Sequence, residues 1–383
     1  MPLSFPNLRP THASTVIPPD SRAIVLTQVS ELGGAERACL ALSRWLFEQS
    51  IPNHIVTYQD TAGLAQAAAH PLTVVQLQPA LKPVVKVLAL RRYVNSRPST
   101  PHPLLSGYQP ALHATLAGVR GFHCLMHDTP SLFSASDETR SLRGRVVRSV
   151  SDRITGFGLR SGGRTIVTSD FLREDCRRLF GVSADIARMG GLGSIENFRL
   201  RPVTTDLRLF SVSRVEANKR IDWMLRALAG LERAPSPLSH RINWRLDVAG
   251  RGSQLTAMRE LAAELGLSDR IQFHGFVTDE QLEQLYDAAD LFLMPAVQGY
   301  GIPAIESLQR GIPVLLHRDS GVSDILLQTP WATVFTGGED QMLPTLSRAI
   351  DSVLAGHHLA EPHPSIPSES TWAEQVARLC NWV

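Results

Sequence analysis

Two basic side chains, Arg214 and Lys219, stand in the segment SRVEANKR, between a predicted strand and a predicted helix. Open α/β sheets bind ligands at the carboxyl ends of their strands, so both side chains are expected to border a binding site. Arginine grips phosphate oxygens with a fork of N–H donors, and lysine acts as a point charge. The pair therefore suits a diphosphate, and a solvated surface pair is the alternative.

A glycine-rich turn opens another predicted helix in the run QGYGIPAIE, residues 298–306. Gly299, Tyr300 and Gly301 form the turn, where backbone can approach a ligand closely. Glu306 follows in the second helical turn among apolar residues, and a carboxylate in that setting needs a hydroxyl or cation partner. A ribose diol would serve. Otherwise the helix dipole alone accounts for an acid near the helix start.

Three further turns offer backbone to a ligand. Gly33 and Gly34 lie in the first strand-to-helix turn, where the helix presents unpaired N–H groups to an anion. Gly250 follows the strand WRLDVA. Phe276 and Val277 follow a strand at a place where a flat base could lie. Glycines also occur in such turns for packing alone, and no G-x-G-x-x-G or P-loop pattern is present, which argues against a dehydrogenase or a P-loop enzyme.

The elements that must position these residues alternate between short apolar runs and amphipathic helices, which predicts parallel sheets. Strands are predicted at 23–29, 54–58, 72–77, 123–127, 165–169, 207–211, 244–249, 271–274, 291–294, 314–316 and 332–335. Helices are predicted at 34–47, 82–93, 140–159, 170–179, 222–231, 254–265, 279–288 and 370–383.

This rhythm lapses between 181 and 207, which places a domain boundary near residue 200. We predict an α/β protein of two doubly wound parallel-sheet domains, residues 1–200 and 201–365, that face each other across a cleft. A Pro-rich linker precedes the final segment, 366–383, whose apolar marks Trp372, Val376, Leu379 and Trp382 predict a docking helix.

Composition narrows the function classes. The 383 residues are 43% hydrophobic, which suits globular domains, and the four cysteines form no C-x-x-C pair, so no zinc site or disulfide framework is indicated. The net charge of +2 hides an asymmetry: residues 1–200 hold 22 basic and 14 acidic groups (+8), and residues 201–383 hold 16 and 22 (−6). The basic half is expected to meet an anionic acceptor or a membrane surface, although two domains can also drift apart in surface charge.

Taken together, these residues resemble the family 4 retaining glycosyltransferases, which have the GT-B architecture of two Rossmann-like domains. The resemblance covers most of the chain and is strongest over 207–326, where the run DAADLFLMPAVQGYGIPAIESLQRGIPVLLHRDSGVSDIL is similar to the family's donor-site motif. It implies transfer of a sugar from a nucleotide sugar to a hydroxyl, with retention of configuration and without an essential metal.

The resemblance also implies roles for individual residues. Arg214 and Lys219 would hold the donor diphosphate, and Glu306, the second acid of the E-x7-E motif, would bind the ribose. His127 would contact the transferred sugar, although His123 lies nearby as a competitor. The donor-binding set is completed by backbone and base-site residues: Gly33, Gly34, Gly250, Phe276, Val277, Gln298, Gly299, Tyr300 and Gly301.

Three positions depart from the family pattern. Gln298 replaces the first acid of E-x7-E and keeps hydrogen bonding without the charge. The segment MGGLG, 189–193, replaces an asparagine–glycine turn, and Asp324 replaces a glutamate.

The resemblance therefore predicts a cytoplasmic glycosyltransferase of surface polysaccharide or lipopolysaccharide synthesis, with no cofactor and no nucleic-acid partner. Its expected partners are a nucleotide sugar, a glycan or lipid-linked acceptor, and a membrane surface at the basic N-terminal domain. The alternatives are a catalytically impaired nucleotide-sugar-binding subunit, suggested by Gln298, and an epimerase or phosphorylase of similar architecture.

Overall fold

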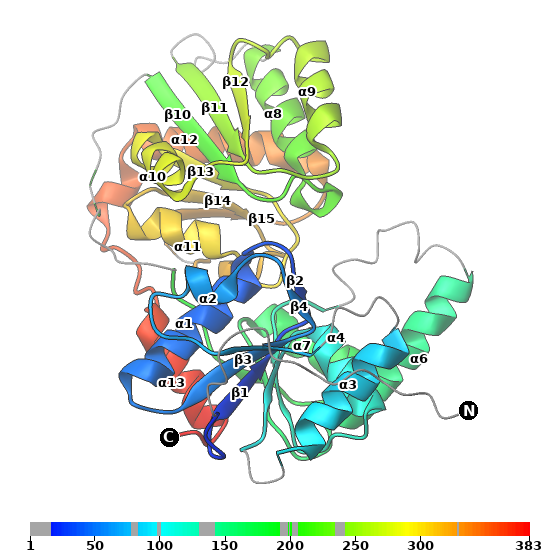
Figure 1. Cartoon of the computed structure of the whole chain (residues 1–383). Coiled ribbons are helices and arrows are strands. Elements are labelled where there is room, and N and C mark those ends of the chain that lie inside the picture. The colour runs from blue at the N-terminus through cyan, green and yellow to red at the C-terminus, as the bar shows by residue number, and fades with distance from the viewer. Residues whose placement is uncertain are drawn as a thin grey trace.

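The computed structural model describes residues 17–77, 83–97, 101–129, 142–191, 198, 200, 206–233, 242–327 and 329–383. They form two α/β domains, one above the other in Figure 1, each built on a parallel sheet. The predicted fold class is confirmed. The predicted boundary near residue 200 falls between the last strand of the first sheet and the first strand of the second.

The N-terminal sheet has the strand order β5-β3-β1-β6-β7-β8-β9, and its neighbours pair in parallel. Its strands are β1 (Arg22–Val25), β3 (Asn53–Thr57), β5 (Val74–Gln76), β6 (Leu104–Ser106), β7 (His123–Met126), β8 (Thr165–Val167) and β9 (Asp185–Ile186), and β2 (Gln28–Val29) pairs with β4 (Gln59–Asp60) beside it. The helices are α1 (Gly34–Glu48), α2 (Leu64–Ala67), α3 (Pro83–Asn95), α4 (Tyr108–Leu116), α6 (Leu142–Leu159) and α7 (Asp170–Phe180).

The C-terminal sheet has the order β12-β11-β10-β13-β14-β15, again with parallel neighbours. Its strands are β10 (Asp206–Val212), β11 (Asn243–Ala249), β12 (Ile271–Gly275), β13 (Leu291–Met294), β14 (Val314–His317) and β15 (Ala332–Phe335). The α-helices are α8 (Ile221–Arg233), α9 (Leu255–Glu264), α10 (Asp279–Ala288), α11 (Ile302–Gln309), α12 (Met342–Leu354) and α13 (Glu369–Leu379), and the 3-10 turns are η2 (Ala217–Lys219), η3 (Gly321–Ile325), η4 (Glu339–Gln341) and η5 (His357–Ala360).

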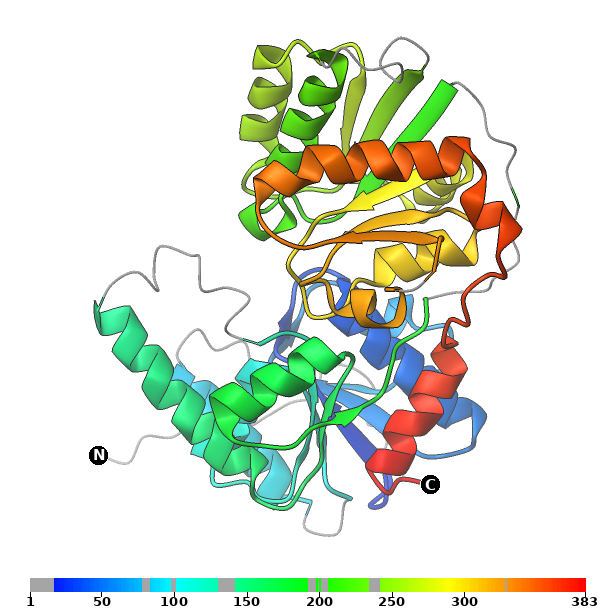
Figure 2. The same cartoon turned by 180° about the vertical axis from the view of Figure 1, so that it is seen from behind.

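Helix α13 returns to the N-terminal domain, as expected, and lies beside α1 (Figure 2). Trp372 and Val376 are fully buried in the same apolar cluster as Leu42 of α1. Arg44 forms an ion pair with Glu369 across this contact. The helix ends at Leu379 rather than at 383, because Asn381 has a positive φ of 53° that a helix does not allow.

Several predicted bounds need correction. The strand predicted at 23–29 is two strands, β1 and β2, on different sheets. The helix predicted at 140–159 is α6, and residues 140 and 141 lie outside the described residues, as does Lys82 at the start of the helix predicted at 82–93. The sequence interpretation missed the short elements β4, β6, β9 and α2, and the helices α4 and α12.

Candidate functional site

Strand β10 delivers Arg214 and Lys219 to the edge of the C-terminal sheet that faces the N-terminal domain. Arg214 is exposed, and Lys219, at the end of η2, is partly buried. The Nζ atom of Lys219 donates a hydrogen bond of 2.7 Å to Oε1 of Gln298. The structure therefore brings together the basic pair and the position where the family motif has an acid.

The surroundings of Lys219 disfavour its charged form. The pKa of Lys219 is lowered to about 8, mainly by burial; the charge of Asp128 opposes this shift, and the charge of Arg214 adds to it. An ammonium with a pKa near 8 is mostly protonated at neutral pH. It is thus a cation with little competing solvation, suited to an anion brought into the site.

The turn before α11 is shaped by its glycines. Gly301 has φ +128°, and a side chain there would crowd Met294 and the amide of Gln298. That amide is held by hydrogen bonds from Nε2 to Sδ of Met294 (2.8 Å) and to Oγ of Ser320 (3.4 Å). Glycine at 301 is therefore needed to place Gln298 against Lys219.

Gly299 is one of the points where the two domains touch. Its N–H donates to Oδ1 of Asp128 (3.0 Å), and its carbonyl accepts from Oγ of Ser169 (2.9 Å). A Cβ at 299 would overlap the carbonyl oxygen of His127. Both Asp128 and Ser169 belong to the N-terminal domain, so this turn closes the interface. Sequence interpretation missed Asp128, although it follows His127 directly.

Tyr300 is anchored away from this point. Its hydroxyl donates to the carbonyl of Met189 (2.6 Å), in the segment that joins the domains. The side chain is 6% exposed. Only the backbone of Tyr300 is left for a ligand, which agrees with the role expected for it. Gly190 and Gly191 also lie in this segment, and residues 192 and 193 are outside the described residues.

Glu306 is held by an aromatic partner. Its Oε2 accepts a hydrogen bond of 2.9 Å from the hydroxyl of Tyr286 on α10. Burial raises the pKa of Glu306, while the Tyr286 hydrogen bond and the charges of Arg310 and Arg37 lower it. The carboxyl thus has one fixed hydrogen bond and a second oxygen for a hydroxyl. A ribose is compatible with this arrangement.

The first glycine turn lies opposite α11. A Cβ at Gly34 would come within 3.3 Å of Cδ1 of Ile302, in the first turn of that helix. The N–H of Gly33, however, already donates to Oε2 of Glu36 (3.1 Å). An anion at this helix start would thus have to displace Glu36 from Gly33.

The turns at Gly250 and Phe276 differ in character. Gly250 has φ +127°, and a Cβ there would overlap the carbonyl of Ser213, so close packing against the end of β10 explains the glycine. Phe276 is 65% exposed, with the Arg251 guanidinium 4.8 Å from its ring centroid. Val277 packs against the core. An exposed ring with a stacked cation offers a surface for a flat base.

His127 lies in surroundings that favour the neutral imidazole at pH 7. Its Nε2 is 3.0 Å from Oγ of Ser106, and burial lowers the pKa of His127 to about 4. The competitor His123 points elsewhere: its Nδ1 accepts from the backbone N–H of Arg164 (3.1 Å). His127 is therefore the histidine that borders Gly299, and it acts as a hydrogen-bonding group rather than as a cation.

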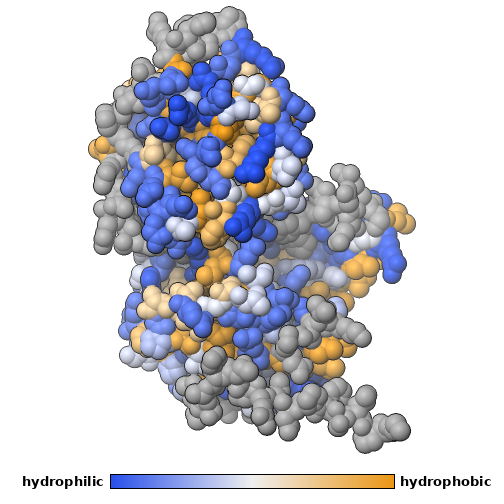
Figure 3. Space-filling view, turned by 45° about the horizontal axis from the view of Figure 1, so that its top comes forward, coloured by the Kyte–Doolittle hydropathy of each residue, from blue (hydrophilic) through white to orange (hydrophobic). Residues whose placement is uncertain are grey.

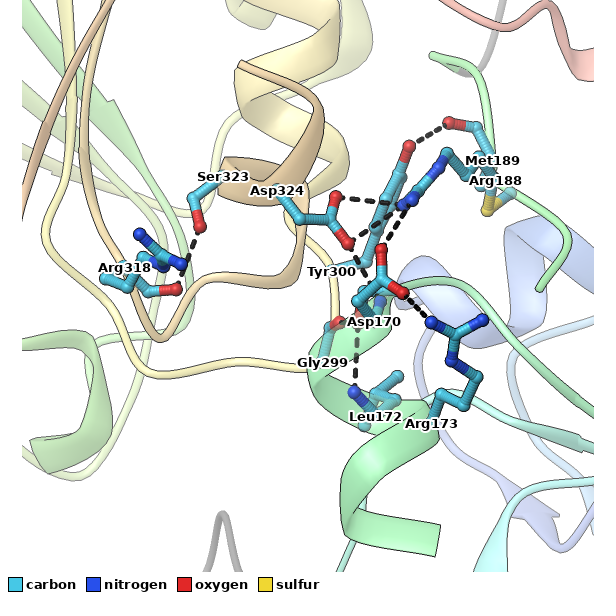
Figure 4. A network of polar contacts seen from close by, with 11 residues as sticks. Asp170, Leu172, Arg173, Arg188, Met189, Gly299, Tyr300, Arg318, Ser323 and Asp324 are labelled. Carbon is cyan, nitrogen blue, oxygen red and sulfur yellow. Dashed lines mark hydrogen bonds and ion pairs between the residues drawn. The ribbon is translucent and has the colours of Figure 1, made fainter. Parts of the chain in front are cut away.

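An ion network ties the domains together beside this site (Figure 4). Asp324 of η3 accepts from Nη1 of Arg188 (2.9 Å) and from the backbone N–H of Asp170 (2.8 Å), which begins α7. Arg188 also bonds Asp170 (2.7 Å), and Arg173 pairs with Asp170. Asp324, which stands where the family pattern has a glutamate, thus forms a contact between the two domains.

A cavity of about 500 Å³ adjoins this network rather than Lys219. It is lined by Asp170, Arg173, Ile186, Arg188, Ser365, Pro367, Thr371 and Gln375. Its two arginines pair with two carboxylates, Arg173 with Asp170 and Arg188 with Asp170 and Asp324, so their charge is already balanced.

Parts of the chain are similar in sequence to known glycosyltransferases. Residues 195–361 match the family model of glycosyl transferases group 1. The chain is 25% identical over 225 residues to alpha-monoglucosyldiacylglycerol synthase of Streptococcus pneumoniae, covering 58% of this chain and 44% of that protein. It is 28% identical over 176 residues to a GDP-mannose-dependent alpha-(1-6)-phosphatidylinositol monomannoside mannosyltransferase of Mycolicibacterium smegmatis, covering 42% and 43%. The aligned parts thus span less than half of either relative.

Solved structures match over nearly the whole chain. Anabaena Alr3699/HepE, in complex with UDP and glucose, superposes with a TM-score of 0.71 at 16% identity, covering 95% of this chain and all of that one. WaaG, a glycosyltransferase involved in lipopolysaccharide biosynthesis, gives a TM-score of 0.69 at 16% identity, covering 94% and 99%. At this identity the likeness concerns the fold. Residues 195–361 are thus similar to the glycosyl transferases group 1 domain, in a chain with the two-domain GT-B fold of these glycosyltransferases.

Proposed function

We propose that this protein is a retaining glycosyltransferase that moves a hexosyl unit from a nucleoside diphosphate sugar to an acceptor hydroxyl. The observation that carries the proposal is the contact between Lys219, Gln298 and the Gly299 turn. It places a partly buried cation next to the turn whose backbone meets Asp128 of the N-terminal domain. A nucleotide sugar, with a diphosphate and a polar ring, fits such a site.

In the proposed reaction, the bond between the sugar anomeric carbon and the diphosphate oxygen breaks. The acceptor oxygen forms its bond to the same carbon on the same face, and its proton passes to the leaving diphosphate. Lys219 and Arg214 would stabilise the negative charge that develops on the leaving group. Two side-chain cations in this position support a reaction that requires no metal.

We further propose a role for the remaining site residues. Glu306, with its free carboxyl oxygen, would accept a ribose hydroxyl, and Phe276 would cover one face of the base. His127, being neutral, would hydrogen-bond the transferred sugar. Gln298 would contact the sugar through its amide. Because the amide lacks the charge of an acid, it would favour different donor sugars from those selected by an acid at this position.

The proposed acceptor is a glycan or a lipid-linked sugar of surface polysaccharide or lipopolysaccharide synthesis, at the inner face of a membrane. Support comes from the names of similar proteins, which include an alpha-monoglucosyldiacylglycerol synthase, a phosphatidylinositol monomannoside mannosyltransferase and WaaG. Glucose and mannose are accordingly the sugars to test first.

Helix α6 supports membrane contact. Leu142, Val146, Val147 and Val150 are 74%, 58%, 58% and 48% exposed, with arginines between them. In Figure 3 apolar and hydrophilic surface are interleaved on the side of the N-terminal domain where this helix lies. Apolar residues that alternate with basic ones suit an anionic lipid surface. No described helix is both long and apolar enough to cross a bilayer.

The activity test is release of UDP or GDP from a panel of nucleotide sugars, with membrane lipid extract as acceptor and with or without EDTA. We expect turnover of one donor, unaffected by EDTA, and NMR of the product should show the anomeric configuration of the donor. Tight nucleotide binding without any product would instead favour the nucleotide-sugar-binding subunit. Donor isomerisation or phosphorolysis would favour the epimerase or phosphorylase.

Vesicle cosedimentation tests the membrane contact. The protein should bind vesicles of phosphatidylcholine and phosphatidylglycerol better than phosphatidylcholine alone, and Val146→Asp with Val147→Asp should weaken binding at least about tenfold. Leu359→Asp, an exposed residue of the other domain, is the matched control. Equal binding by both variants would contradict the role of α6.

A further inference from the structure

Lys219 has no carboxylate beside it at position 298 of its own domain, where the E-x7-E motif would have its first acid. Its hydrogen-bond acceptor is the neutral amide of Gln298. The carboxylate that acts on it is Asp128, which follows β7 in the N-terminal domain. Gln298 and Gly299 are adjacent, and Gly299 donates its N–H to Asp128 at 3.0 Å. The Lys219–Gln298 and Gly299–Asp128 hydrogen bonds thus involve adjacent residues of one turn, which brings the two domains together beside Lys219.

The surroundings of Asp128 combine burial with partners that favour its charged form. It is largely enclosed at the domain interface, and burial raises its pKa, while the Gly299 N–H and the cations Lys219 and Arg214 lower it. An enclosed carboxylate is stable only beside such partners. The groups that face Lys219 are therefore Arg214 from its own loop, Gln298 from the turn before α11, and Asp128 from the opposite domain. The neighbouring His127 is neutral.

We propose that Asp128 is a positioning residue that supplies, from the N-terminal domain, the negative charge that Gln298 no longer provides. It acts through Lys219, whose protonated form it favours, and through Gly299, whose backbone it fixes. The role in transfer rests on the proposed function. One consequence is that the lysine is charge-balanced only when the two domains are in contact.

A titration of Lys219 tests this without any donor. The chain contains three lysines, Lys82, Lys86 and Lys219, so reductive methylation with ¹³C-formaldehyde gives few NMR signals, and Lys219→Met identifies the one of interest. Asp128→Asn keeps an acceptor for the Gly299 N–H but removes the charge. We expect it to shift the Lys219 titration to lower pH, and the double variant Asp128→Asn with Gln298→Glu to return it.

The kinetic arm uses the same variants. Asp128→Asn should lower kcat/KM at pH 8 by about 10- to 100-fold, because fewer molecules of the variant carry a protonated Lys219 at that pH. At pH 6.5 the loss should be smaller, because Lys219 is more fully protonated there. Adding Gln298→Glu should recover at least about tenfold. Asp152→Asn, which removes a buried carboxylate bonded to Tyr108 (2.9 Å), is the control and should behave as wild type.

The outcomes separate the two proposals. An unshifted Lys219 titration, or a loss in Asp128→Asn that Gln298→Glu does not recover, would overturn the role of Asp128 while the glycosyltransferase stands. A shifted titration in a protein that turns over no nucleotide sugar would support the charge pairing and overturn the proposed function. If Asp128→Asn fails to fold, Asp128→Glu, which keeps the charge, must fold and titrate as wild type, or the proposal fails.

Discussion

Replacing Lys219 with methionine should lower activity and raise stability together. The change keeps the length of the side chain and removes its charge. Burial lowers the pKa of Lys219 from 10.5 to about 8, so the folded state disfavours the ammonium. Because a tenfold change in an ionisation equilibrium is worth about 1.4 kcal/mol, holding the charged form costs the fold about 3 kcal/mol as an upper limit.

The net gain in the free energy of unfolding is smaller than this upper limit for two reasons. Lys219 is only partly buried, which leaves some hydration, and methionine leaves Oε1 of Gln298 without its donor, at a cost of about 1 kcal/mol. We therefore expect the free energy of unfolding at pH 7 to rise by about 1–2 kcal/mol. The folded state loses the proton near pH 8 and the unfolded state near 10.5, so wild type gains stability as pH rises through this window.

Urea unfolding of both proteins at pH 7 and at pH 10.5 measures this effect. The advantage of Lys219→Met should be present at pH 7 and fade by pH 10.5, while its affinity for UDP or GDP falls about 10- to 100-fold by calorimetry. A variant that is less stable than wild type at pH 7, or that keeps full nucleotide affinity, would refute the placement of a costly cation at the diphosphate site.

Three other changes test neighbouring parts of the site. In wild type, kcat/KM should be level below pH 8 and fall above it as Lys219 loses its proton, and Lys219→Arg should move that limb upward in the pH profile. Gln298→Glu should change the ranking of donors in a competition assay, and an unchanged ranking would mark Gln298 as peripheral. Gly299→Ala should separate the domains and abolish transfer, because its Cβ overlaps the carbonyl oxygen of His127, and X-ray scattering in solution would detect the separation. Gly34→Ala should lower activity by less than about tenfold, since only a methyl group of Ile302 must move.

Most of the fold could be predicted from sequence patterns because most helices and strands are regular. Helix α8 and strand β11, for example, show clear apolar periodicity with period 3.6 or 2. Strand β6 was missed because three residues are too short for a pattern, and α4 because Pro110 stands in its first turn. The break between β1 and β2 depends on pairing with different strands, which no local pattern encodes.

The placement of candidate residues was predictable where a strand's carboxyl end positions them, as for Arg214 and Lys219. It was not predictable where tertiary contacts decide. Asp128 and Arg188 are ordinary charged residues until the interface sets them against Gly299 and Asp324. Gly250 shows the opposite case, since its close approach serves the packing of two strands.

The most direct test of the account is a crystal structure of the protein with UDP or GDP. We predict the diphosphate within hydrogen-bonding distance of Lys219 Nζ and the Arg214 guanidinium, and the ribose beside Glu306. A nucleotide bound elsewhere, such as in the cavity beside Arg188, or a diphosphate that contacts neither cation, would contradict it.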